Sequence, residues 1–190
     1  MRPFRPSSCS VVRRGVGLAA TVASAAAALA LLLPGPALPA NANTHRALTS
    51  LESGVLEQIN GIRAAHGLTP LQLNDRLTAA ATAHCTQMVT YGFFGHQTAA
   101  GLSFAQRMAW YYPMGRSTYY DVGENLYWTS SSVDSSVVVA HWMRSAEHRM
   151  NILTPGWRQI GIAAVTVPSA PGVYAGLGVT VVAADFGVRR

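Results

Sequence analysis

The chain has 190 residues, of which 49% are hydrophobic and 12% charged, enough for one domain with a sizeable apolar core. Its formal charge of +6 comes mostly from the N-terminus, because four of the fourteen arginines lie in the first 42 residues and all eight acids follow them. The other ten arginines and the eight acids leave a net charge of +2, which gives little support to nucleic-acid binding through a basic surface.

The first 42 residues have the parts of an export signal. An arginine-containing start precedes an uncharged apolar run over 15–33, and Ala40-Asn41-Ala42 is a small-x-small cleavage site. We therefore predict that residues 1–42 are a cleaved signal peptide and that 43–190 form a single secreted, extracellular domain. A retained membrane anchor is the alternative, since the run has about the length of a span. After cleavage, no stable membrane span is expected.

The two cysteines cannot pair in the mature protein, because Cys9 leaves with the signal. The domain must then rely on its apolar core instead of a disulfide. Cys85 is interpreted as a buried small hydrophobic residue.

Helical periodicity dominates the first part of the domain. A stripe of leucine, isoleucine and valine predicts a helix over 44–66, with Thr44 as its N-cap. A second helix is predicted over 74–91, with Asn74 as N-cap. His84 falls on the buried face of this helix, where a hydrogen-bonded core histidine is the expected role.

The stretch after the second helix combines glycine, histidine and aromatic residues. A glycine-flanked turn carries His96, which a rigid helix would hold beside a cleft. A shorter helix is predicted over 102–112. The loop 111–120 contains four tyrosines and could line an amphipathic ligand site or lie as a lid over the core.

A carboxylate follows in a strand-like segment. Residues 120–128 predict a short strand that holds Glu124. After a serine-rich connection, a helix is predicted to begin at Asp134 or Ser135 and to run into the cluster Glu147-His148-Arg149.

The C-terminal part predicts a hairpin. Residues 159–167 are β-branched and strand-like, and 173–186 are another apolar strand segment, broken by Gly176 and Gly178. A Pro-Gly turn separates the two. Helices, one strand, a helix and two strands do not alternate as a doubly wound sheet requires. The order favours an α+β arrangement with an antiparallel sheet covered by helices.

Several short motifs follow one another in order along residues 50–187. They are Leu77 with Ala81 and Met88, Phe93-Phe94-Gly95-His96, Gly101, Arg107, Gly123-Glu124-Asn125, Trp142-Met143-Arg144-Ser145, His148-Arg149-Met150-Asn151-Ile152-Leu153, Ile160-Gly161 and Asp185-Phe186-Gly187. The set resembles the CAP superfamily, also called SCP-like or PR-1-like domains, in its secreted bacterial branch. The resemblance implies a three-layer α-β-α sandwich with a central antiparallel sheet flanked by helices.

The resemblance also implies a cavity with two histidines and two acidic residues. His96 and His148 match the histidines, and Glu124 matches the first acid. Ser145 stands where the second acid is usual, and Glu147 stands where glycine is usual, so whether Glu147 supplies the second carboxylate is open. These five residues are the candidate cavity residues, and Glu124 and His148 are also the candidates for catalysis.

Three kinds of chemistry are compatible with these residues. His96 and His148, with Glu124, could bind a divalent metal such as zinc and activate water. The histidines are 52 positions apart without an HExxH motif, so the metal rests on the resemblance. The same residues could form a hydrogen-bonded cluster that joins the sheet to the helices. A triad of Ser145, His148 and Glu124 would need a continuous helix to set the serine beside the histidine, and the chain lacks a Gly-x-Ser-x-Gly motif.

The functional hypothesis is a secreted binding module. It would hold a small amphipathic, lipid-like or peptide ligand, or a component of the cell envelope, in a cavity near His96, Glu124 and His148. The first alternative is a metal-dependent hydrolase of peptide or envelope material that uses the same residues. The second alternative is an interaction protein with a vestigial cavity. We favour a binding role over an enzymatic one and expect no nucleic-acid partner.

Overall fold

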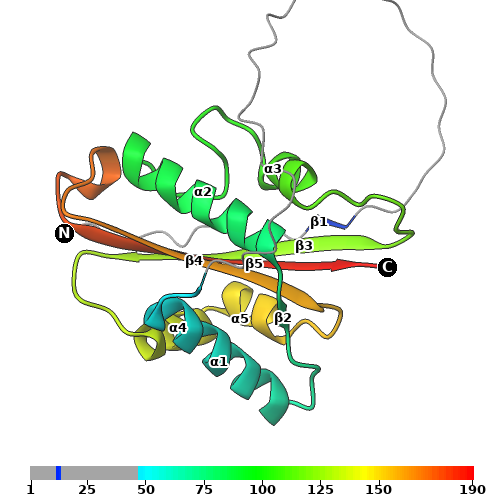
Figure 1. The fold of residues 1–190 in the computed structure, drawn as a ribbon. Coiled ribbons are helices and arrows are strands. Elements are labelled where there is room, and N and C mark those ends of the chain that lie inside the picture. The colour runs from blue at the N-terminus through cyan, green and yellow to red at the C-terminus, as the bar shows by residue number, and fades with distance from the viewer. Residues whose placement is uncertain (1–11, 14–46) are drawn as a thin grey trace, which may run out of the picture.

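The computed structural model describes residues 12–13 and 47–190, which form a sheet between two layers of helices (Figure 1). The elements are β1 (Val12–Arg13), α1 (Ser50–Ala65), β2 (Gln72–Leu73), α2 (Asp75–Tyr91), α3 (Phe104–Tyr111), β3 (Tyr120–Thr129), α4 (Ser135–Arg144), α5 (Ala146–Leu153), β4 (Gln159–Val167), a 3-10 turn (Gly172–Tyr174) and β5 (Val179–Arg189). The predicted signal peptide lies outside the described residues, apart from β1.

The sheet has the strand order β1-β3-β5-β4-β2. The β3–β5 and β5–β4 pairs are antiparallel, as the sequence predicts. The two-residue β2 adds a parallel pair with β4 that no sequence pattern indicated. Helices α2 and α3 cover one face, and α1, α4 and α5 cover the other (Figure 1). The predicted α+β sandwich is therefore confirmed.

Helix α2 begins and ends where the sequence predicts. The Asn74 side-chain oxygen accepts hydrogen bonds from the backbone N–H groups of Arg76 and Leu77, at 3.0 and 3.2 Å. Gly92 ends the helix in the left-handed conformation, with φ of 69°, which glycine adopts without a steric penalty.

Helix α1 starts later than predicted. The expected cap, Thr44, lies outside the described residues, and the cap in the structure is Thr49. Thr49 and Glu52 form a reciprocal capping box, in which each side chain accepts a hydrogen bond from the other residue's backbone N–H. The second Glu52 oxygen accepts a hydrogen bond from Ala164 N–H at 2.9 Å, so the same carboxylate anchors the start of α1 to β4.

The helix predicted to run into the Glu147-His148-Arg149 cluster is two helices. Ser145 has φ of −86° and ψ of 127°, an extended conformation that ends α4 and begins α5. Its hydroxyl accepts the His148 N–H at 3.4 Å as the N-cap of α5. The helix that carries Trp142 therefore ends at Ser145, and a second helix carries the cluster.

The last strand also begins later than predicted. Residues 172–174 form a 3-10 turn, and Ala175 and Gly176 follow with φ of 55° and 79°. Positive φ angles are incompatible with a strand, so β5 starts at Val179 and not at residue 173.

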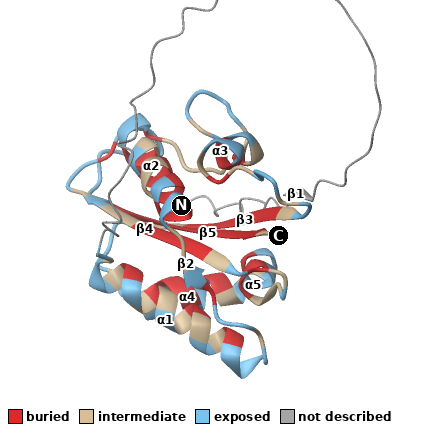
Figure 2. Cartoon of the chain, turned by 45° about the vertical axis from the view of Figure 1, so that its right-hand side comes forward, coloured by how far each residue is buried: buried red, intermediate tan, exposed pale blue. Residues whose placement is uncertain are grey.

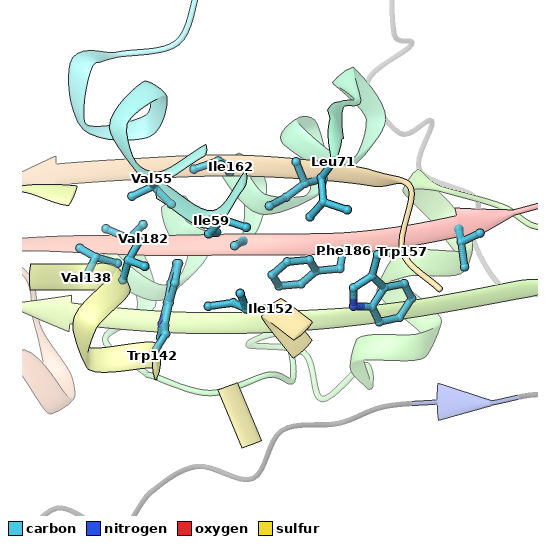
Figure 3. Packing of buried hydrophobic residues seen from close by; sticks show 14 residues of the cluster. Val55, Ile59, Leu71, Val138, Trp142, Ile152, Trp157, Ile162, Val182 and Phe186 are labelled. Carbon is cyan, nitrogen blue, oxygen red and sulfur yellow. The ribbon is translucent and has the colours of Figure 1, made fainter. Parts of the chain in front are cut away.

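The core has three parts, one on the face that α1, α4 and α5 cover and two on the face that α2 and α3 cover. Buried residues are concentrated on the strands (Figure 2). Trp142, Trp157 and Phe186 belong to the part under α1, α4 and α5 (Figure 3). Met88 and Leu126 belong to the part under α2. Because side chains alternate along a strand, this division fixes which residues of β3 and β5 face α2 and α3.

Helix α2 lies so close to β4 that only glycine fits at position 161. A Cβ atom there would stand 2.0 Å from the backbone carbon of Leu77 and 2.1 Å from the backbone nitrogen of Thr78. This contact brings α2 down onto the middle of the sheet.

Opposite effects are expected from alanine at two glycines. Gly161→Ala should lower the free energy of unfolding by about 1–3 kcal/mol or more, because α2 must move away from the sheet. Gly61→Ala, in the exposed interior of α1 with no atom near its Cβ position, should raise it by about 0.5–1 kcal/mol. Urea unfolding of both variants checks this. Equal effects of the two substitutions would contradict the close contact.

Candidate functional site

The site is built on β3, where Glu124 faces α2 and α3. Its neighbours on the same face, Val122 and Leu126, pack into the core parts on that side of the sheet. Asn125 points to the other face, where its amide donates to the His148 carbonyl at 3.0 Å. The Gly-Glu-Asn motif is therefore in the middle of a strand, with the carboxylate and the amide on opposite faces.

Glu124 is fully buried and held by two side chains from other elements. His96 Nδ1 lies 2.6 Å from one carboxylate oxygen, and Arg107 Nη2, from α3, donates to the other. Burial by itself would raise the pKa of Glu124, but the positive charge of Arg107 and the His96 hydrogen bond outweigh it and lower the pKa to about 2. Glu124 is therefore an ionised structural anion with its oxygens already engaged.

The loop that carries His96 is fixed at several points. His84 Nε2 lies 2.8 Å from the Gly95 carbonyl oxygen, and the Tyr174 hydroxyl donates to the Phe93 carbonyl at 2.9 Å. His84 is the hydrogen-bonded core histidine that the sequence predicts. Because burial lowers its pKa to about 4, it is neutral at neutral pH and its Nε2 carries the proton that Gly95 accepts.

The Glu124 contact also selects the form of the His96 ring. A carboxylate accepts only, so Nδ1 of His96 is the donor. In the neutral ring, Nε2 then carries a lone pair, and this atom is buried without a hydrogen-bond partner. The His96 side chain is 10% exposed. The site thus contains one imidazole whose orientation Glu124 fixes.

A cleft of about 600 Å³ adjoins this imidazole. The described residues that line it belong to the single segment 91–99, with Tyr91, Phe93, Phe94 and His96 among them. The aromatic loop 111–120, which was a candidate lining, does not contribute to it. Tyr112 of that loop is buried in the core, as the alternative role of the loop, a lid over the core, requires of it.

His148 comes from the other layer. It is buried on α5, its ring centroid lies 6.4 Å from that of His141, and its Nδ1 is covered without a hydrogen-bond partner. Burial, with smaller effects of His141 and His96, lowers the pKa of His148 to about 4. The structure thus brings His96 and Glu124 into contact, whereas His148 approaches the sheet from the opposite face.

The two remaining candidates have local roles. Ser145 caps α5 through its hydroxyl, and the helix break removes the side-by-side placement with His148 that a catalytic triad required. Glu147 is exposed in the first turn of α5, where a negative charge is favourable. The carboxyl group that does lie next to Glu124 is that of Asp185, its direct partner on β5.

Sequence reasoning assigned no role in the site to Arg107 or Asp185. Both belong to the ordered motif set, which by itself indicates no contact with Glu124. The signal in the sequence is a charged residue among apolar ones. Asp185 is the one charged residue in the apolar run 179–188, and Arg107 stands next to Met108 on the buried side of a short amphipathic helix. A charge at a core position requires a partner, and each of these residues is buried near Glu124.

The residues present do not complete a zinc site. Structural and catalytic zinc ions take three or four protein ligands, and no group of three or more His, Cys, Asp or Glu side chains in residues 12–13 and 47–190 could hold a metal ion. The Arg107 guanidinium also occupies one oxygen of Glu124 and would repel a divalent cation. No helix in the described part of the chain has the length and apolarity to cross a bilayer.

Sequence comparisons place these features among known proteins. The sequence model of the CAP family, described as the cysteine-rich secretory protein family, matches residues 56–182. The uncharacterized protein YkwD of Bacillus subtilis is 31% identical over 119 residues, which are 62% of this chain and 44% of that protein. The membrane protein YlbC of the same organism is 26% identical over 114 residues, 60% of this chain and 31% of that protein. The chain therefore spans less than half the length of these relatives.

Solved structures share the fold. An outer surface protein of Borrelia burgdorferi superposes with a TM-score of 0.55 at 19% identity, over 72% of this chain and 90% of that one. A cysteine-rich secretory protein of Staphylococcus aureus gives 0.51 at 18% identity, over 72% and 38%. An extracellular protein of Bacillus anthracis with an SCP domain gives 0.50 at 22% identity, over 77% and 45%.

Proposed function

Because the chain belongs to the CAP, or cysteine-rich secretory protein, family, we propose that it is a binding module that holds a small amphipathic, lipid-like or peptide ligand in the cleft beside His96. The observation that carries the proposal is a cleft of about 600 Å³ that places aromatic side chains next to an oriented imidazole. A volume of this order accommodates a small-molecule ligand. The module would act outside the cell or at the cell envelope, as the names of its structural neighbours say of them.

The two parts of the cleft suit an amphipathic ligand. Tyr91 is 65% exposed, and Phe93 and Phe94 are half-buried, so the lining provides aromatic surface that a ligand can cover. His96, which also lines the cleft, supplies a polar ring whose orientation is fixed by its hydrogen bond to Glu124.

The low pKa of Glu124 favours binding over hydrolysis. A general base works best with a pKa near the working pH, whereas the pKa of Glu124 is about 2. It is also fully buried and paired with Arg107. These properties suit a residue that orients His96, and they support a cleft that binds without reacting.

Native mass spectrometry of the protein purified from its host tests this proposal. We expect a bound mass that is released on denaturation, and we expect Tyr91→Ala to lower its occupancy at least threefold. Trp110→Ala is the matched control, because Trp110 is also an exposed aromatic residue, at 79%, but does not line the cleft. A protein that is always empty, or equal losses in the two variants, would overturn the proposal.

A further inference from the structure

Asp185 is a buried acid whose oxygens receive no hydrogen bond. It lies in the middle of β5, directly opposite Glu124 on β3 and Gly161 on β4. Both carboxyl groups are 0% exposed. Neither Asp185 oxygen has a hydrogen-bond partner among the described donors. Because side chains that are directly opposite on neighbouring strands point to the same face, the group that faces Asp185 is another acceptor, the Glu124 carboxylate.

The close packing of α2 keeps this pair dry. The helix rests on Gly161, the residue next to Asp185 across the sheet. From α2, His84 and Cys85 contribute to the electrostatics of the pair. Burial holds the pKa of His84 low and that of the Cys85 thiol high, so both groups are neutral at neutral pH. The other nearby groups are Arg107 from α3 and His96 from the loop.

An ionised Asp185 would lack the partners that a buried carboxylate requires. Arg107 has two further nitrogens that carry hydrogen, Nε and Nη1, and both are buried without a partner, so neither donates to Asp185. His96 donates its Nδ1 proton to Glu124. A buried carboxylate without donors is strongly unfavourable, whereas a neutral carboxylic acid can donate its own O–H to a neighbouring carboxylate.

We propose that Glu124 and Asp185 form a buried pair of carboxyl groups that holds one proton, in which Asp185 is the neutral acid and donates a hydrogen bond to Glu124. Asp185 is thereby a positioning residue, which fixes the carboxylate that orients His96. Burial, the charge of Glu124 and a hydrogen bond with Glu124 raise the pKa of Asp185 well above its usual range, against the opposing charge of Arg107. The pair follows the general rule that two adjacent carboxyl groups do not both ionise.

In this arrangement Glu124 accepts from three elements. Arg107 comes from α3, His96 from the loop after α2 and Asp185 from β5. A carboxylate has about four lone-pair positions, so the three hydrogen bonds can form together. Loss of the Asp185 donor should therefore let the Glu124 side chain rotate and loosen its contact with His96.

Carboxyl NMR tests the proton directly. The chain has four aspartates, so labelling with side-chain ¹³C aspartate gives four carboxyl signals. At pH 7 the full-length protein should show a signal at the shift of a protonated acid. Asp185→Asn should remove the acid signal. Four ionised aspartates in the wild type, or an acid signal that persists in Asp185→Asn, would overturn the proposal.

The positioning role needs a second readout. Asparagine can donate to Glu124 as the protonated acid does, whereas alanine cannot, so Asp185→Asn should retain the downfield proton signal of His96 Nδ1–H and Asp185→Ala should broaden or lose it. Retention of that signal in folded Asp185→Ala would show that Asp185 does not position the site. The wild-type carboxyl spectrum tests the shared proton even where the alanine variant does not fold.

Discussion

Arg107→Met should be among the most destabilising single substitutions in the domain, with a loss of about 3–5 kcal/mol in the free energy of unfolding. Arg107 is 4% exposed and donates to the fully buried Glu124. Methionine preserves much of the side-chain length but removes the charge, which leaves a carboxylate in an apolar layer. Protonation of Glu124 limits the loss, because the acid can take up a proton when its cation is gone. Urea unfolding at pH 7 measures the change.

A double-mutant cycle separates the ion pair from the packing of the side chain. Arg107→Met combined with Glu124→Gln should lose less than the sum of the two single variants by at least about 1 kcal/mol, because no unpaired charge is left. Arg116→Met is the surface control, since Arg116 is exposed, and it should lie within about 0.5 kcal/mol of the wild type. Additive single effects would mean that the two charges do not depend on each other.

The elements that were predicted correctly have their causes within a few residues of sequence. Asn74 and Gly92 supply the start and the end of α2 through their own side chain and backbone freedom. The β-branched pattern over 159–167 coincides with β4. Local chemistry decided these elements, so the sequence alone was sufficient.

The elements that were missed depend on partners far away in sequence. Residues 72–73 form a strand only because β4 lies beside them. Ser145 divides a helical pattern into two helices so that α5 can turn against β3, where Asn151 donates to the Glu124 carbonyl at 3.0 Å. The hydrophobic periodicity of the sequence does not indicate such a turn, because both helices keep a buried face.

The residues of the site show the same difference between what the sequence indicates and what only the folded chain brings together. The contact between His96 and Glu124 was expected from the resemblance, since the two motifs lie 28 positions apart and no spacing rule joins them. Arg107 and Asp185 carried no functional assignment, because neither belongs to the implied set of histidines and acids. Electrostatics within the folded core gives them their roles: one buried anion requires a cation, and a second buried acid requires a proton.

The acid sensitivity of the fold should change when His84 is replaced with glutamine. Burial lowers the pKa of His84 from 6.5 to about 4. Between these two values the unfolded chain binds a proton at His84 and the folded chain does not. The stability contributed by the neutral ring is therefore complete above pH 6.5 and is lost as the pH falls toward 4. The loss approaches about 1.4 kcal/mol per pH unit and about 3 kcal/mol across the window.

Glutamine at position 84 can still donate to the Gly95 carbonyl but does not titrate, so His84→Gln should flatten the plot of unfolding free energy against pH between 6.5 and 4. His148, whose pKa is also lowered to about 4, keeps its own slope in both proteins, and any effect of Asp185 is common to both. His66→Gln replaces an exposed histidine and is the matched control. Denaturant unfolding at half-unit pH steps distinguishes them. An unchanged slope in His84→Gln would mean that the ring is protonated in the folded protein, and the loop that presents His96 would then be held by a charged, not a neutral, hydrogen bond.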